Sequence, residues 1–155
     1  MNDNHKSIHQ TLDQVRAMIA WEYVSQAKKE LKDFEKYVSL VKKFPAIINN
    51  NGLGQALAFI FSKANFNSKN AETFLFIQLQ EWLTRSEKNK DIMHYSPPYP
   101  EQKDKNKSIN DHLIKCIISN NSMLYLRATH ETMALLDKLR NFASGLAIDK
   151  GERHG

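Results

Sequence analysis

The sequence predicts an all-α protein with a single domain, a bundle of about five to six helices carrying one long flexible loop. The five glycines and four prolines of the 155-residue chain all fall within 45–54, 97–100 and 145–155, so long segments contain no turn signal. Leucine and alanine far outnumber valine, which favours helix over strand. We expect the bundle to cover residues 1–147 and a disordered tail to cover 148–155.

The N-terminal part of the chain predicts two helices. The first covers 7–28 and buries one face at helical spacing, formed by Ile8, Leu12, Val15, Ile19 and Tyr23. The second buries a side formed by Leu31, Phe34, Val38 and Val41. Because a proline disfavours helical backbone in the residue before it, we expect a kink or break at Pro45.

An unusual run of asparagine and glycine follows, Asn49-Asn50-Asn51-Gly52, with a second glycine at Gly54. Asparagine and glycine tolerate left-handed backbone, and glycine allows close approach of another segment. We therefore predict a hinge here, before a helix resumes over 55–64. The next helix, over 70–85, is apolar on nearly every side and is expected to be the central one.

Residues 87–107 are polar and charged and contain Pro97-Pro98-Tyr99-Pro100. This segment is longer than an ordinary connection, so we predict a mobile loop. A helix over 108–119 follows, and a last helix is expected to begin at an N-cap, Ser122, and to end at Gly145.

Histidine-based metal and catalytic motifs are incomplete in this sequence. His130-Glu131 begins an H-E-x-x-H zinc motif, but position 134 is alanine, so the second histidine is missing. No glutamate is followed by a histidine three positions later, which removes the ligand pairs of a di-iron bundle. Two pairs of possible ligands stand four residues apart without further ligands nearby in sequence: His5 with His9, and His112 with Cys116.

Phosphate-binding and thiol chemistry are not indicated either. Gly52-Leu53-Gly54 follows no predicted strand and lacks the third glycine of a dinucleotide loop, and the sequence contains no G-K-[ST] phosphate loop. Cys116, the lone cysteine, lies in an apolar run and is expected to be buried and inert. We expect no enzyme, no metal and no cofactor.

Cellular location follows from the same composition. A lone cysteine cannot form an intramolecular disulfide, which favours a reducing compartment. Residues 1–20 carry charges throughout, and the apolar stretches are too short to cross a bilayer. The sequence therefore predicts a soluble cytoplasmic protein without membrane contact.

The charge pattern is consistent with a polyanionic partner. The chain has 22 Lys and Arg against 17 Asp and Glu, a net charge of +5. If the backbone stays helical, five lysines project within an arc of about 120°: Lys28, Lys32, Lys36, Lys42 and Lys43. The alternative is a solvated helix face, because acids are interspersed.

The last helix carries a second polar side, with Arg127, His130, Lys138 and Asn141 directed away from its leucines. These residue types suit phosphate oxygens, or they merely solubilise the helix. Five phenylalanines stand at helical spacing and are expected to be core residues rather than base-stacking platforms: Phe59, Phe61, Phe66, Phe74 and Phe76.

Four segments of the chain form a recognisable set: Tyr37-Val38, Lys43-Phe44-Pro45, Asn51-Gly52-Leu53-Gly54-Gln55-Ala56-Leu57-Ala58-Phe59, and 125–143 with the sequence YLRATHETMALLDKLRNFA. Together they resemble the small all-helical subunit of type III-B CRISPR–Cas (Cmr) effector complexes. The related small subunit of type III-A complexes is near this pattern, but the Asn-Gly-Leu-Gly-Gln segment fits type III-B better.

The resemblance implies a non-catalytic ribonucleoprotein subunit that acts in antiviral defence. Copies would stack on one another beside the filament of backbone subunits that holds the guide RNA, and the groove between the filaments would receive the target RNA. The other partners implied are the backbone subunit and the large polymerase-like subunit, which carry the catalysis.

Charge clustering near the matching segments gives our candidate nucleic-acid-binding residues. They are Lys36, Lys42, Lys43, Lys63, Arg127, Lys138 and Arg140. Such cations would hold sugar-phosphate weakly and without sequence preference. The alternative is an all-helical protein–protein adaptor whose basic surface meets an acidic partner and has no nucleic-acid role.

Overall fold

The computed structural model describes residues 3–64, 69–85, 95–102, 111–119 and 121–148. These residues form five helices and no strand, which confirms the predicted all-α bundle. The helices are α1 (Asp3–Glu30), α2 (Phe34–Lys63), α3 (Ala71–Leu83), α4 (His112–Ser119) and α5 (Ser122–Ile148). The tail expected over 148–155 lies almost wholly outside the described residues.

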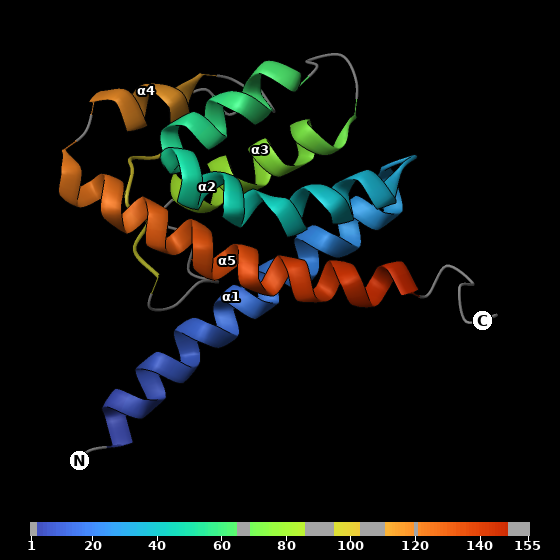
Figure 1. Cartoon of the computed structure of the whole chain (residues 1–155). Coiled ribbons are helices and arrows are strands. Elements are labelled where there is room, and N and C mark those ends of the chain that lie inside the picture. Colours follow the sequence, from blue (N-terminus) through green and yellow to red (C-terminus); the bar gives the residue numbers. More distant parts are fainter. Residues whose placement is uncertain (1–2, 65–68, 86–94, 103–110, 120, 149–155) are drawn as a thin grey trace.

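Helix α2 is at the centre of the bundle. It packs against α3 and α5 and also contacts α4, whereas α1 packs mainly against α5 (Figure 1). The N-terminal part of α1 extends beyond the other helices (Figure 1). None of the helices in the described part of the chain has the length and apolar character needed to cross a membrane.

Short polar side chains fix where α2 and α3 begin. The Asp33 carboxylate accepts a hydrogen bond from the backbone N–H of Lys36 at 3.3 Å, and the Asn70 side-chain oxygen accepts one from the N–H of Thr73 at 2.7 Å. Each cap satisfies an N–H group that has no partner within its own helix. Residues 31–33 are not helical, so α1 and α2 are separate helices.

The ends of α5 differ from the predicted ones. The N-cap side chain is Asn121, whose side-chain oxygen accepts from the N–H of Leu124 at 3.0 Å, so the prediction of Ser122 is wrong by one residue. Gly145 does not end the helix either, because α5 continues to Ile148. A glycine costs about 1 kcal/mol within a helix, which packing over the rest of α5 outweighs.

Pro45 lies within α2, and the break predicted there is wrong. Only Gly52 departs from helical φ and ψ inside α2. A proline inside a helix costs about 3 kcal/mol. Phe44 and Ile48, on either side of it, are both buried, and burying two such side chains contributes roughly 3–6 kcal/mol. Burial of these two side chains is therefore large enough to offset the cost of the proline.

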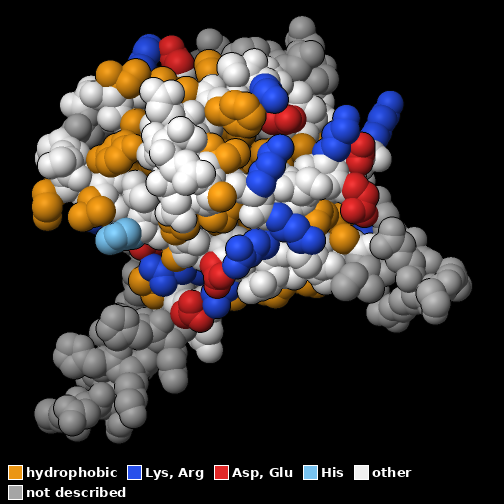
Figure 2. Space-filling model, in the orientation of Figure 1, with side chains coloured by type: hydrophobic (Ala, Val, Ile, Leu, Met, Phe, Trp, Pro, Cys, Tyr) orange, Lys and Arg blue, Asp and Glu red, His pale blue; other side chains and the backbone are white. Residues whose placement is uncertain are grey.

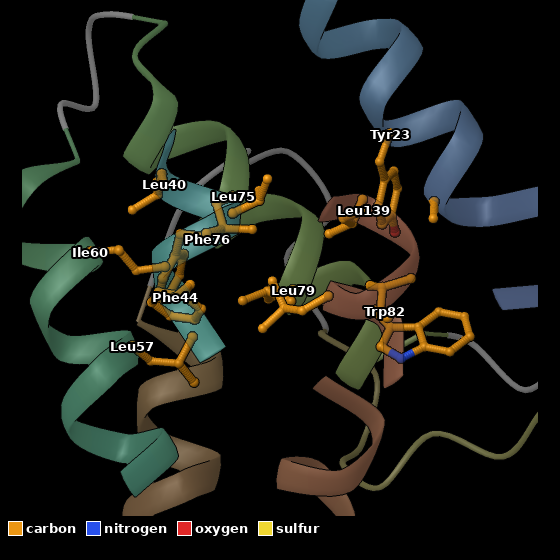
Figure 3. Packing of buried hydrophobic residues seen from close by; sticks show 14 of the residues in the cluster. Tyr23, Leu40, Phe44, Leu57, Ile60, Leu75, Phe76, Leu79, Trp82 and Leu139 are labelled. Atoms are coloured by element: carbon orange, nitrogen blue, oxygen red, sulfur yellow. The ribbon is translucent and has the colours of Figure 1, made fainter. Parts of the chain in front are cut away.

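The hydrophobic core lies between α2 and α3 and extends to α1 and α5 (Figure 3). The labelled core side chains in that view are Tyr23, Leu40, Phe44, Leu57, Ile60, Leu75, Phe76, Leu79, Trp82 and Leu139. A buried amide links three helices inside it: Gln78 accepts from the Tyr37 hydroxyl at 2.6 Å and donates to the Tyr23 carbonyl at 3.1 Å. Burial raises the pKa of Tyr37 well above its usual value, so the hydroxyl stays a donor.

Residues 95–102 pack on the bundle, although we predicted one mobile loop over 87–107. The rest of that range, 87–94 and 103–107, lies outside the described residues. Tyr95 stacks on Trp82 with ring centroids 3.8 Å apart, and its hydroxyl donates to the Trp82 carbonyl at 2.7 Å. Tyr99 is buried, and its N–H donates to the Leu83 carbonyl at 3.1 Å. This segment therefore closes the C-terminal end of α3.

Removing the Tyr95 ring tests whether this segment is part of the folded core. We expect Tyr95→Ala to lower the free energy of unfolding by about 2–4 kcal/mol, because the stacked ring and its hydrogen bond are both lost. Tyr95→Phe keeps the ring and should cost only about 1 kcal/mol. Urea unfolding followed by circular dichroism measures both, and an unchanged midpoint for Tyr95→Ala would contradict the packed arrangement.

Candidate nucleic-acid interface

The break in α2 is held by a tyrosine from α5. Gly52 has φ 85° and ψ 161°, a backbone conformation open almost only to glycine. The N–H of Gly54, two residues further on, donates to the Tyr125 hydroxyl at 3.0 Å. A Cβ atom at Gly52 would lie 3.0 Å from that hydroxyl. The two segments that carried the family resemblance therefore meet at one contact.

Other residues of the 125–143 segment also have packing roles. Thr129 Oγ1 donates to the Tyr125 carbonyl at 2.9 Å within α5. Glu131 forms a two-bond ion pair with Arg16 of α1, at 2.9 and 3.3 Å. Four apolar residues on the inner face of the 125–143 segment are fully buried: Leu135, Leu136, Leu139 and Ala143. The segment therefore positions α5 between α1 and α2.

The cations predicted on α2 lie on its outer surface. Lys36, Lys42 and Lys43 are exposed, and none of their ammonium groups forms an ion pair with another residue that the structure describes. Lys36 and Lys43 are seven residues apart, about two helical turns, so they share one side of the helix. Figure 2 shows Lys and Arg side chains gathered over α2 and α5, with Asp and Glu among them. These three lysines are free to meet an external anion.

The five-lysine arc predicted from a continuous helix does not form. The chain leaves the helix at 31–33, so Lys28 belongs to α1 and Lys36 to α2. The Lys28 ammonium donates to the Leu146 carbonyl at 3.0 Å. A cation is stabilised near the C-terminal end of a helix, which carries partial negative charge. Lys28 therefore links the end of α5 to α1 and does not belong to the basic surface of α2.

The cations predicted on α5 have intramolecular partners. Lys138 pairs with Asp13 of α1 at 3.1 Å, and Arg140 lies 3.6 Å from Asp137. Arg127 donates to the Ser96 carbonyl at 2.8 Å and so holds the 95–102 segment. Their charges still contribute to the field around α5, but each is partly occupied within the molecule.

Lys63 is exposed at the C-terminal end of α2, with its ammonium 4.5 Å from the centre of the Phe59 ring. Phe59 is 37% exposed, so its assignment to the core is wrong. Phe76 is fully buried, as expected, and Phe66 lies outside the described residues. Lys63 is also far along α2 from Lys43, on the other side of the break at Gly52.

Among the residues that the structure describes, the possible metal ligands do not gather into a metal site. No group of three or more His, Cys, Asp or Glu side chains there is placed to hold a metal ion. His112 lies 2.9 Å from the Pro100 carbonyl and 3.7 Å from Cys116 Sγ. Burial raises the pKa of the Cys116 thiol, which lowers its thiolate fraction.

The fold and this surface together define a small helical bundle with a basic outer face on its central helix. A family model described as CRISPR-associated protein (Cas_Cmr5) matches residues 12–146. The chain therefore belongs to the Cmr5 family.

A solved structure supports the same assignment. The chain is similar to a CRISPR-associated Cmr5 family protein from Thermus thermophilus, whose crystal structure it matches with a TM-score of 0.59 and 25% sequence identity. The match covers 86% of this chain and 98% of that protein. The shared architecture includes nearly the whole of the bundle.

A double-mutant cycle tests the contact between Gly52 and Tyr125. We expect Gly52→Ala to lower the free energy of unfolding by roughly 2–3 kcal/mol, because alanine is strained at this φ and ψ and its Cβ meets the tyrosine hydroxyl. Tyr125→Phe should cost about 1 kcal/mol, since the Gly54 N–H loses its acceptor.

The losses of unfolding free energy caused by Gly52→Ala and by Tyr125→Phe should not be additive. In the Tyr125→Phe background the hydroxyl is gone, so Gly52→Ala should cost less than in the native protein, while the backbone strain remains. Denaturant unfolding of the four proteins gives the coupling energy. Strictly additive costs would mean that the hydroxyl and the break do not interact.

Proposed function

We propose that this protein is a non-catalytic small subunit of a type III-B CRISPR RNA-guided (Cmr) effector complex that works in the cytoplasm in antiviral defence. It stacks in copies beside the backbone filament and helps to hold the target RNA, or its duplex with the guide, through the basic face of α2. Family membership supports the assembly, and the three exposed lysines of α2 support the RNA contact.

The observation that best supports the RNA contact is that Lys36, Lys42 and Lys43 are exposed and form no ion pair with another residue that the structure describes. An ammonium group without a carboxylate partner gains more from a phosphate than one that must first leave an ion pair. Each such contact is weak and independent of sequence, and repetition in stacked copies raises the overall affinity. Base pairing with the guide would read the sequence of the target.

Exposed apolar side chains support contacts with other protein subunits. Ile118 is 77% exposed, Met123 70% and Leu126 51%, all near the junction of α4 and α5. On α1, Met18 and Trp21 are also about half exposed. Exposed groups of large apolar side chains mark interaction surfaces. We assign these two apolar surfaces to contacts with the backbone subunit, the large polymerase-like subunit and a second copy of this chain.

Affinity purification of the tagged protein from its native cell tests the assembly. We expect the other Cmr subunits and repeat-derived guide RNA to co-purify, as identified by mass spectrometry and RNA sequencing. Recovery of an unrelated acidic protein in stoichiometric amount without RNA would favour the adaptor alternative instead.

Neutralising two lysines tests the RNA contact in the assembled complex. We expect Lys42→Gln with Lys43→Gln to weaken capture of target RNA and to reduce the slope of log K against log salt by about 1–2, because up to two phosphate contacts are lost. Filter binding over a salt series measures both quantities.

Lys115→Glu is the matched control for this pair of substitutions. It changes the net charge by the same two units, but Lys115 lies on α4 and pairs with Asp111 at 3.2 Å. The control should leave capture and its salt slope close to native. Equal effects of the two variants would mean that only net charge matters, and unchanged capture by the α2 variant would refute the proposed face.

A further inference from the structure

Three consecutive asparagines, Asn49 to Asn51, stand exposed on helical backbone in α2. Asparagine is one of the poorer helix formers, and exposed helix positions are usually filled by alanine, lysine or glutamate. We predicted that these residues serve a hinge, but Gly52 alone departs from helical φ and ψ. A need for left-handed backbone therefore does not explain Asn49 and Asn50.

These two asparagines continue the rows of free lysines. Lys36, Lys43 and Asn50 are seven residues apart in turn, and Lys42 and Asn49 form a parallel pair with the same spacing. Seven residues make about two turns of helix, so each row keeps to one side. From Lys36 to Asn50 the surface is about 21 Å long at 1.5 Å per residue. We call it the α2 row, defined as Lys36, Lys42, Lys43, Asn49 and Asn50.

Small exposed residues keep the α2 row accessible. Ser39 and Ala46 lie between its polar members on the same side of the helix and are exposed themselves. A nucleic-acid strand can therefore approach α2 closely between the lysines and the asparagines.

Hydrogen bonding separates the three asparagines. Asn51 Nδ2 donates to the Ile47 carbonyl at 3.4 Å, within its own helix. The side-chain carboxamides of Asn49 and Asn50 form no hydrogen bond with another residue in the described part of the chain. Their carboxamides each offer two donor hydrogens and an acceptor oxygen to an outside group.

We propose that the α2 row selects ribose over deoxyribose, with its lysines bound to phosphates and with Asn49 and Asn50 bound to 2′-hydroxyl groups. This inference rests on the proposed function and adds strand-type selection to it. A lysine ammonium is only a donor and meets phosphates that RNA and DNA share. A carboxamide can both donate and accept, as the 2′-hydroxyl does, and DNA lacks that group.

Titration of the full-length ¹⁵N-labelled protein with oligouridylate and with the matching oligodeoxyuridylate tests the proposal by NMR. We expect the side-chain amide signals of Asn49 and Asn50 to shift with the RNA oligomer only. The RNA should bind about 5- to 30-fold tighter, the value of one to two net hydrogen bonds of about 1 kcal/mol each. Asn49→Ala with Asn50→Ala should reduce this ratio to about one while leaving the DNA affinity unchanged.

Asn51→Ala is the matched control, because its amide is already bonded within α2, and the native ratio should persist. Alanine favours helix, so the variants keep α2 folded. An equal affinity of the native protein for both oligomers, or a ratio that Asn49→Ala with Asn50→Ala leaves unchanged, overturns the inference.

The variant Lys42→Gln with Lys43→Gln shows whether only strand selection is wrong or whether the proposed RNA contact is wrong as well. If Lys42→Gln with Lys43→Gln lowers the affinity for both oligomers while the asparagine variant changes nothing, the basic face stands and strand selection is wrong. If neither oligomer shifts any signal of the α2 row, both the RNA role of the basic face and the inference are wrong.

Discussion

The hydrogen bond from the Gly54 N–H to the Tyr125 hydroxyl joins the break in α2 to the first turn of α5 and so sets where these two helices meet. Gly52 interrupts the helix, and the interruption frees backbone groups that a regular helix would pair. A long side chain from another helix supplies the missing acceptor at this place. The contact fixes the start of α5 against the middle of α2. Arg16 and Lys28 then fix the rest of α5 to α1, through Glu131 and the Leu146 carbonyl.

This arrangement separates packing residues from surface residues along the same two helices. Within the segments that resemble the family, Tyr37, Phe44 and Leu139 are fully buried, and Tyr125 closes the break. Lys43 belongs to those segments too, but its side chain is exposed. The resemblance therefore identifies the family mainly through residues that hold the fold. The proposed RNA contact instead depends on the outer side of α2, where helix geometry alone aligns the lysines with the asparagines.

Periodicity predicted the helices because burial of one face leaves a repeat of three and four residues in the sequence. Periodicity did not predict the features that depend on tertiary contacts. The helix continues through Pro45 because flanking side chains are buried, and Tyr95 and Tyr99 find their partners only when α3 is in place. For the candidate site, the sequence predicted the exposed lysines of α2. It could not reveal that Lys138, Arg140 and Arg127 have partners inside the molecule, because those partners are distant in sequence or depend on side-chain geometry.

Cross-linking in the assembled complex shows whether α2 faces the target RNA. A target RNA carrying 4-thiouridine would be bound by the purified effector complex, irradiated and digested, and the attached peptides of this subunit identified by mass spectrometry. We expect the cross-links to concentrate on the part of α2 that contains Lys36, Lys42 and Lys43. Cross-links confined to α4 or to the exposed apolar residues of α1 would contradict it, because the RNA would then lie on a different face.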